Sequence, residues 1–190
     1  MNILFVCTGN TCRSPMAEAI LREKTNHHVR SAGIFASDGQ PASAQTLEVL
    51  EENGIHHSHQ STPVDETVLQ WADVVLTMTA NHRDLVKQQF SAYADKVYTL
   101  VEYVDSSCQK AWDQLQKAYS QLEEKKLDPS ANQEAIQALK EEIDELEKKV
   151  SQVDIVDPFG SNVMIYQKTY QELNKYLELL VKKLDNKDRE

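Results

Sequence analysis

The chain has 190 residues, a length that fits one domain or one domain with an insertion. Hydrophobic residues make up 41% of it and charged residues 26%, which suits a soluble globular protein. The formal net charge of -10 argues against nucleic acid as a partner, because proteins that bind nucleic acid carry basic patches. An anionic substrate stays open, since a local cradle of N–H groups can bind phosphate against the global field.

The expected location is the cytoplasm, with no membrane partner. Three cysteines at spacings unlike those of a disulfide framework favour a reducing compartment. The apolar start of the chain is too short for a signal peptide, and no stretch of the sequence reaches the length of a membrane-spanning helix.

The first predicted element is a strand from Ile3 to Val6, a wholly apolar run typical of a strand buried on both faces of a parallel sheet. Cys7-Thr8-Gly9-Asn10-Thr11-Cys12-Arg13-Ser14 follows, and a helix is predicted at residues 15–24. The N–H groups of the loop and the helix start, the helix dipole and the planar fork of Arg13 together form a cradle for an oxyanion. The same field favours the thiolate of Cys7, a nucleophile aimed at phosphorus under a bound phosphate.

Strands and helices alternate through much of the chain, which predicts a four-stranded parallel sheet with helices on both faces. The loop after the first strand then lies at the carboxyl end of that strand, where open α/β sheets bind ligands. Further strands are predicted at residues 28–34, 73–78 and 96–104, and helices at residues 42–53, 62–71, 81–90 and after residue 160, with Thr62 and Asn81 as the caps of the second and third of these helices.

Residues 105–152 carry two helical segments with a heptad seam, and we predict an antiparallel helical hairpin that protrudes as a coiled-coil arm. The turn is expected at residues 127–130, with Asp128 or Ser130 capping the second helix. Such a seam most often buries itself, and the alternative is that the hairpin docks a partner or self-associates. The seam residues are Trp112, Leu115, Tyr119 and Leu122, then Ile136, Leu139, Ile143, Leu146 and Val150.

Three stretches of the chain resemble the low-molecular-weight protein tyrosine phosphatases. They are the loop of residues 7–14 directly after the first strand, Ser31-Ala32-Gly33, and Asp157-Pro158-Phe159-Gly160. The resemblance covers residues 1–104 and 153–190, the expected phosphatase domain, and residues 105–152 depart from it as an inserted hairpin. It implies a cysteine-dependent phosphatase that acts on phosphorylated proteins and needs no metal and no cofactor.

The resemblance also implies the roles of single residues. Cys7 is then the nucleophile, Arg13 the phosphate clamp and Asp157 the general acid, preferred over Asp154 because the family motif places the acid immediately before Pro-Phe-Gly. By the same matching Asn10 shapes the loop and Ser14 donates a hydrogen bond to the thiolate. The residues expected to bind phosphate and substrate are Thr8, Gly9, Asn10, Thr11, Cys12, Ser14, Phe35 and Phe159.

Thr11 decides the expected substrate. Tyrosine-directed members of the family usually carry a bulkier aliphatic residue here, and this form of the loop resembles the protein arginine phosphatase branch. The guanidinium of phosphoarginine is rich in N–H donors, which the Thr11 hydroxyl can accept and hydrocarbon would leave unpaired. Phe35 and Phe159 are candidates to stack on the guanidinium plane. We therefore expect hydrolysis of protein phosphoarginine through a phosphocysteine, with a tyrosine phosphatase of the same mechanism as the alternative.

Other interpretations stay open. A non-catalytic phosphate reader is less expected because the three catalytic residues are intact, and a thiol-coupled arsenate reductase needs a cysteine relay for which only Cys108 remains. Cys12 either forms a disulfide with Cys7 under oxidants, which makes the enzyme redox-sensitive, or packs behind the loop. The run of residues 56–59, His-His-Ser-His, is expected to be solvated and to bind no metal, because it lacks partner cysteines and clustered carboxylates.

Overall fold

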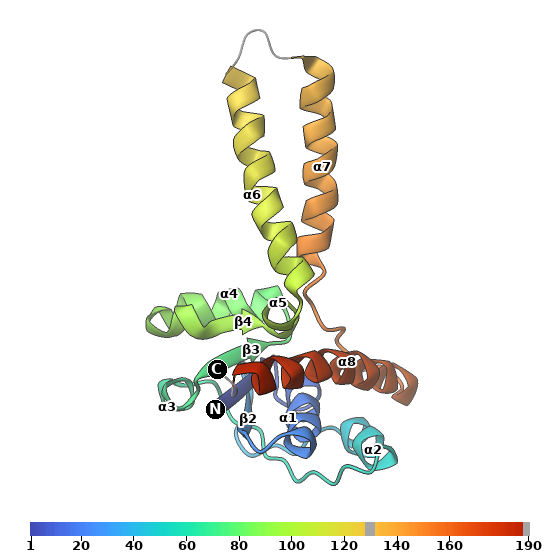
Figure 1. Ribbon diagram of the computed structural model, residues 1–190. Coiled ribbons are helices and arrows are strands. Elements are labelled where there is room, and N and C mark those ends of the chain that lie inside the picture. The colour runs from blue at the N-terminus through green and yellow to red at the C-terminus, as the bar shows by residue number, and fades with distance from the viewer. Residues whose placement is uncertain (128–131, 188–190) are drawn as a thin grey trace. The chain divides into compact units, whose positions relative to one another are not determined.

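The structure is a computed structural model that describes residues 1–127 and 132–187. The chain divides into two compact units, one formed by Met1–Val104 with the chain from Asp154 onward and the other by Asp105–Val153. The first unit is a sheet with helices and the second is a pair of long helices (Figure 1). Among the described residues, no helix has the length and apolar character needed to cross a membrane.

A parallel sheet with the strand order β2-β1-β3-β4 forms the centre of the first unit. β1 lies inside it, and the side chains from Ile3 to Val6 have no exposed surface, as their apolar run predicts. The predicted four-stranded parallel sheet is thus confirmed. The strands are β1 (Asn2–Cys7), β2 (His28–Gly33), β3 (Val74–Thr77) and β4 (Val97–Thr99).

Helices cover both faces of this sheet (Figure 1). Leu4 and Val6 of β1 share a buried cluster with apolar residues of α3 and α4. Ile3 and Phe5 alternate to the other face, where α1 packs with α8. The helices of this unit are α1 (Arg13–Lys24), α2 (Ala44–Glu52), α3 (Glu66–Trp71), α4 (Ala80–Gln89), the 3-10 helix η1 (Ser91–Lys96), α5 (Leu100–Val104) and α8 (Val163–Lys187).

The fourth strand is shorter than predicted. It ends at Thr99, and the segment expected to continue it to residue 104 is the helix α5. The reason is a reciprocal cap, in which the Glu102 N–H donates to Thr99 Oγ1 at 3.0 Å and the Thr99 N–H donates to a Glu102 carboxylate oxygen at 3.0 Å. This pairing satisfies two backbone donors at a helix start, so the chain turns into a helix as soon as β4 ends.

Two helices begin at other residues than the sequence predicted. α3 is capped by Asp65, whose Oδ1 accepts from the Val68 N–H at 2.8 Å, because Thr62 and Pro63 run extended beside Gly33 at the end of β2. α4 is capped by Thr79 instead of Asn81, and Thr79 Oγ1 accepts from the His82 N–H at 3.2 Å. In both places the residue that caps the helix lies within three positions of the predicted one.

The second unit consists of α6 (Ser106–Leu127) and α7 (Gln133–Ser151), which lie side by side (Figure 1). Trp112 and Tyr119, predicted in the seam, are 46% and 43% exposed, and Ala111 and Ala118 take their place. Small residues one position earlier let the two backbones approach, while the large rings stay at the side. The buried seam is Ala111, Leu115, Ala118, Leu122, Leu139, Ile143 and Leu146, flanked by Ile136 and Val150.

The cap of α7 differs from the prediction. Asn132 caps this helix through a hydrogen bond of 2.9 Å from the Glu134 N–H to its Oδ1. Asp128 and Ser130, the two predicted caps, lie outside the described residues. The coiled-coil supercoil expected for this hairpin stays a prediction.

The last residue of β2 forms the floor beneath the loop that follows β1. Gly33 pairs with Cys7, and the next two N–H groups donate to the carbonyls of Cys7 and Thr8 at 3.0 and 2.9 Å. A Cβ atom at Gly33 would lie 2.7 Å from the carbonyl oxygen of Thr8 and 2.8 Å from the amide nitrogen of Asn10. Because both are backbone atoms, the loop keeps its shape only if residue 33 has no side chain.

We predict that Gly33→Ala lowers the free energy of unfolding by about 1–3 kcal/mol, the usual cost of forcing an extra methyl group into packed surroundings. Urea denaturation measures it. Gly9→Ala in the same loop is the control, since a Cβ there meets only Thr11 Oγ1, at 3.7 Å, and fits. Equal losses in the two variants would contradict the predicted role of Gly33.

Candidate active site

The loop between β1 and α1 is held in shape by Asn10. Its φ of 55° lies in the left-handed region, which asparagine tolerates better than most residues. The buried side chain donates to Ser14 Oγ at 2.9 Å and to Ser31 Oγ at 2.8 Å, and its Oδ1 accepts from the Thr62 N–H at 2.9 Å. These bonds tie the loop to α1, to β2 and to the segment before α3.

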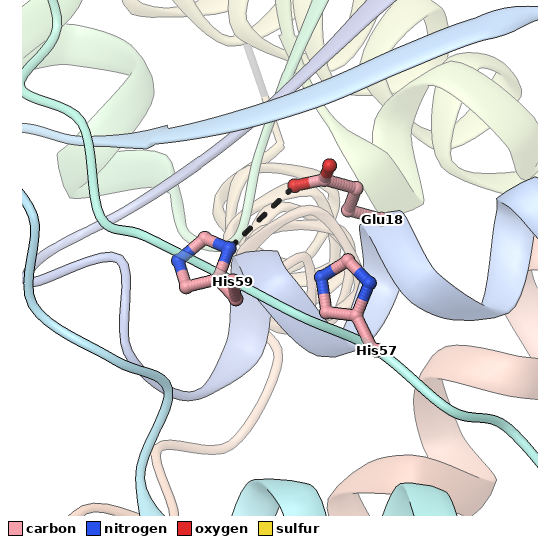
Figure 2. A group of neighbouring side chains, drawn as sticks. All are labelled: Glu18, His57 and His59. Carbon is pink, nitrogen blue, oxygen red and sulfur yellow. Dashed lines mark ion pairs between the residues drawn. The ribbon is translucent and has the colours of Figure 1, made fainter.

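Further polar residues support Asn10 from behind. His59 Nε2 donates to the Asn10 carbonyl oxygen at 2.7 Å, and Ser31 Oγ donates to Glu18 Oε2 at 2.5 Å. Arg22 pairs with the other Glu18 oxygen, Oε1, at 2.6 Å. Figure 2 shows Glu18 and His59 facing each other, joined by an ion-pair contact of 4.0 Å. Neither Glu18 nor His59 was predicted as part of this site.

The histidine run of residues 56–59 is divided by the fold. His56 is exposed and contacts Glu51, whereas His57 and His59 point toward Glu18 (Figure 2). Burial lowers the pKa of His57 below its usual value. The sequence shows no carboxylate cluster beside this run, but the fold brings one carboxylate to it from α1.

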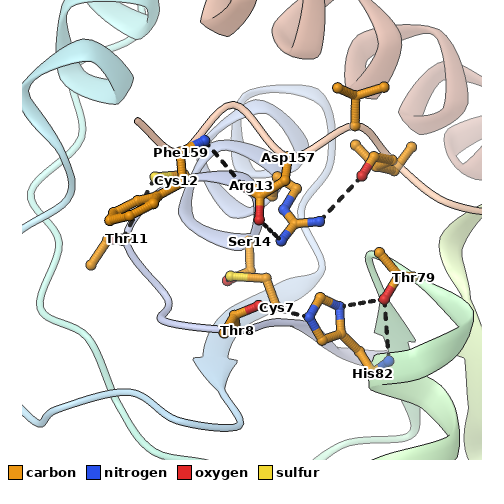
Figure 3. Close-up of polar contacts among 12 residues, drawn as sticks. Cys7, Thr8, Thr11, Cys12, Arg13, Ser14, Thr79, His82, Asp157 and Phe159 are labelled. Carbon is orange, nitrogen blue, oxygen red and sulfur yellow. Dashed lines mark hydrogen bonds and ion pairs between the residues drawn. The ribbon is translucent and has the colours of Figure 1, made fainter. Parts of the chain in front are cut away.

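Cys7 lies at the end of β1 with its sulfur facing the start of α1 (Figure 3). Its Sγ is 2.9 Å from Ser14 Oγ. Ser14 Oγ accepts from Asn10, and its own proton faces two acceptors, the Cys7 sulfur at 2.9 Å and the Ala32 carbonyl oxygen at 3.4 Å, of which the sulfur is the nearer. A hydroxyl that donates to sulfur favours the charged thiolate over the thiol.

The N-terminus of α1 faces the same place. α1 begins at Arg13, no side chain caps it and its first turn has no acidic residue. By contrast, α2, α3 and α4 are capped by the side chains of Ser43, Asp65 and Thr79. The N–H groups of the first turn of α1 and the positive end of its dipole therefore favour an anion beside Cys7.

Arg13 joins the loop after β1 to the segment that carries Asp157. Its buried guanidinium donates from Nη2 to Asp157 Oδ2 at 2.7 Å and from Nη1 to the Ile155 carbonyl at 3.2 Å (Figure 3). The half-exposed Asp157 also accepts from the Phe159 N–H at 3.1 Å. Asp154, the other carboxylate considered, instead accepts from the Ala80 N–H at the start of α4 at 2.7 Å. The structure thus brings Asp157 to Arg13 and places Asp154 in a capping position at α4.

His82 is a member of the site that sequence reasoning missed. Its Nε2 lies 2.8 Å from Thr8 Oγ1, and its Nδ1 lies 2.9 Å from Thr79 Oγ1 (Figure 3). Burial, reinforced by the nearby charge of Arg13, lowers the pKa of His82 to about 4. The imidazole is therefore neutral near pH 7 and holds Thr8 in place. Its position just after β3, at the carboxyl edge of the sheet, was the signal available in the sequence.

The remaining predicted residues either pack behind the loop or have side chains that are partly or largely exposed. Cys12 is buried behind the loop, where its Sγ lies 3.4 Å from the Tyr166 hydroxyl of α8. The Thr11 carbonyl accepts from the Ser43 N–H at 2.9 Å, and its side chain is partly exposed. Phe35 and Phe159 are 68% and 75% exposed, so both rings are open to a bound molecule.

Comparison with known proteins decides the family. The family model described as low molecular weight phosphotyrosine protein phosphatase matches residues 2–152. The chain belongs to this family. A protein-arginine-phosphatase of Bacillus subtilis (strain 168) is 38% identical to this chain. The alignment has 194 positions and covers 100% of this chain and 99% of that protein. The resemblance drawn from the sequence is confirmed.

Solved structures of low molecular weight phosphatases share the fold. The YwlE arginine phosphatase from Geobacillus stearothermophilus superposes with a TM-score of 0.72 at 32% identity, over 98% of this chain and 94% of that chain. A YwlE arginine phosphatase mutant with a phosphorylated active-site serine gives a TM-score of 0.72 at 36% identity, over 100% of this chain and 99% of that chain.

His82 predicts a pH dependence of stability. Its pKa is about 4 in the folded chain against the usual 6.5, so the unfolded chain binds more protons between these values. This histidine therefore stabilises the fold fully above pH 6.5, and the contribution is lost as the pH falls toward 4.

We expect the fall in unfolding free energy from pH 6.5 to pH 4 to be shallower in His82→Gln than in wild type. Urea denaturation at a series of pH values measures the slope. His28→Gln, at an exposed position of β2, is the control and is expected to follow the wild type. A His82→Gln slope as steep as that of wild type would show that His82 is not the group responsible.

Proposed function

We propose that this chain is a protein phosphatase that hydrolyses phosphoarginine on proteins through a phosphocysteine intermediate. The observation that carries the proposal is the buried Arg13 guanidinium, which meets Asp157 at 2.7 Å next to the Cys7–Ser14 pair. Nucleophile, clamp and proton donor thus meet at the carboxyl end of β1. A relative that carries a phosphorylated active-site serine supports covalent phosphoryl transfer at this loop.

In the first step, the Cys7 thiolate attacks phosphorus in line with the leaving group. The S–P bond forms as the P–N bond to arginine breaks, or the P–O bond in the tyrosine alternative. Arg13 and the N–H groups of the loop and of α1 hold the equatorial oxygens, where charge redistributes in the transition state. When the phosphate takes the place of Asp157 on Arg13, the half-exposed Asp157 in its carboxylic acid form donates its proton to the leaving nitrogen and becomes a carboxylate.

In the second step, Asp157 acts as a base. Its carboxylate takes a proton from a water molecule, whose oxygen attacks phosphorus while the S–P bond breaks. The electron pair returns to Cys7 Sγ, where the hydrogen bond from Ser14 at 2.9 Å stabilises the leaving thiolate. Inorganic phosphate leaves, and both residues return to their starting states.

The preference for phosphoarginine rests on Thr11 and on the aromatic rim. The partly exposed Thr11 hydroxyl can accept a guanidinium N–H that an aliphatic residue would leave unpaired. Phe35 and Phe159, both largely exposed, offer ring faces on which a planar guanidinium can stack. Two relatives named protein-arginine-phosphatase, 38% and 33% identical to this chain, support the same substrate.

The wider setting follows from the same chemistry. The phosphatase domain comprises residues 1–104 and 153–190 and the inserted hairpin residues 105–152, a division supported by the two compact units. The cytoplasm is the proposed location, since Cys7 and Cys12 are reduced thiols and the nucleophile must stay so. A docking or self-association role for the hairpin stays a prediction. A Cys7–Cys12 disulfide under oxidants also stays a prediction, and the packing of Cys12 on Tyr166 supports its alternative.

We predict that Asp157→Asn lowers kcat for a chromogenic aryl phosphate by about 10²–10⁴-fold, the usual contribution of a positioned proton donor. Asp154→Asn is the matched control and is expected to retain most of the activity, because the amide oxygen still accepts from the Ala80 N–H. Cys7→Ser is expected to abolish turnover, which separates an enzyme from a phosphate reader. Equal effects at positions 154 and 157 would refute the assignment of the acid.

We predict that wild type cleaves a phosphoarginine peptide with a higher kcat/KM than the matched phosphotyrosine peptide. In Thr11→Ile the ratio is expected to move toward phosphotyrosine by about 10-fold or more, since a lost polar contact leaves guanidinium donors unpaired. Hydrolysis of a small aryl phosphate controls for intact chemistry. A wild type that prefers phosphotyrosine would favour the tyrosine phosphatase alternative.

A further inference from the structure

Glu18 of α1 meets two histidines from the segment between α2 and α3 behind the catalytic loop. Glu18, His57 and His59 each offer one ligand atom, and the three atoms lie within 4.8 Å of one another (Figure 2). We propose that these three side chains form a binding site for a divalent transition metal ion of the Zn²⁺ class. The proposal goes beyond the phosphatase function and does not depend on it.

The donor set and its spacing suit zinc. Two imidazoles and one carboxylate with an open fourth position form a common zinc arrangement, in which bonds of about 2.0–2.2 Å place neighbouring donors about 3.3 Å apart. Here His59 Nδ1 lies 4.0 Å from Glu18 Oε2, and the widest separation among the three donors is within 4.8 Å. Inward shifts of about 1 Å or less at each side chain therefore complete the coordination.

Two of the ligands are already oriented by outer partners. His59 donates its Nε2 proton to the Asn10 carbonyl at 2.7 Å, which leaves the Nδ1 lone pair directed to the Glu18 side. Glu18 is held by Ser31 on Oε2 and by Arg22 on Oε1. Metal-binding histidines and carboxylates characteristically have such hydrogen bonds on their far sides, which fix the tautomer and the ring orientation.

His57 supplies an unsatisfied atom. Its Nε2 is buried and has no hydrogen-bond partner among the described residues. The ring stacks on that of His59, with centroids 5.7 Å apart and an interplanar angle of 26°. A buried polar atom without a partner is unfavourable, so an ion that binds this nitrogen would remove the cost.

The surroundings select the metal and give it access. Arg22 balances the charge of Glu18, the one carboxylate of the cluster. A hard cation such as Mg²⁺ or Ca²⁺ needs several oxygen ligands and finds too few of them here, whereas imidazole suits Zn²⁺. A cavity of about 400 Å³, lined by Glu18, Ser58 and His59 among others, borders the cluster. It provides the route for an ion and room for a water molecule in the fourth position.

The proposed site is separate from the nucleophile. Glu18 is connected to Cys7 indirectly, through a chain of hydrogen bonds that runs over Ser31, Asn10 and Ser14. An ion held by Glu18 and the two histidines therefore needs no contact with the Cys7 sulfur, and this difference in donor atoms makes the site testable by spectroscopy.

The test uses the full chain, as wild type and as Cys7→Ser, which removes the competing thiolate. Zn²⁺ binding is titrated against a chromophoric zinc indicator in each background, alone and with His57→Ala or His56→Ala. His56 is the matched control, because it is the adjacent histidine and lies outside the cluster. We expect one Zn²⁺ per chain in the parent and in His56→Ala, and an affinity at least 10-fold lower in His57→Ala. Excess Mg²⁺ is expected not to compete.

Two further measurements make the result decisive. Co²⁺ in place of Zn²⁺ is expected to give visible d–d bands without a thiolate charge-transfer band, and Zn²⁺ is expected to raise the melting temperature of the His56→Ala chain but not of the His57→Ala chain. His57→Gln, which keeps the size of the side chain, replaces His57→Ala if the latter does not fold. Absence of binding, equal affinity in all variants or a thiolate band in the Co²⁺ spectrum would each overturn the proposal.

Discussion

The buried amide of Asn10 is the contact on which the catalytic loop depends. Its backbone adopts φ 55°, a conformation that is costly for most residues, and its side chain offsets that cost with bonds to α1, to β2 and to Thr62. Asn10 also fixes the position of Ser14 Oγ, which lies 2.9 Å from the Cys7 sulfur. A fully satisfied buried network of this kind is rigid, so the sulfur is positioned before any substrate arrives.

A second constraint acts between distant parts of the sequence. Arg13 and Asp157 are 144 residues apart, and two helices of the second unit intervene along the chain. α6 and α7 bury Leu115, Leu139 and Ile143 against each other, so the intervening segment has its own core. A segment that buries its own apolar surface needs no packing against the sheet, so one chain can combine the family fold with this pair of helices.

Sequence patterns predicted the features that depend on residues close together in the chain. The apolar run of β1 and the loop after it follow from local composition and spacing. The end of β4 was missed because the Thr99–Glu102 cap outweighs the strand propensity of the residues between them. Contacts such as Thr8 with His82, 74 positions apart, or Asn10 with His59, 49 positions apart, depend on the folded arrangement, and the sequence offered at most the position of His82 just after β3.

The long separation of Arg13 and Asp157 has a consequence during synthesis. Cys7 lies between β1 and α1, which are adjacent in the sequence, whereas Asp157 reaches Arg13 only when the final segment docks and Tyr166 packs on Cys12. A molecule whose final segment has not docked therefore has Cys7 in place without Asp157 beside Arg13. Arg13 then has no carboxylate partner, so this side of the site is complete only in the fully folded chain.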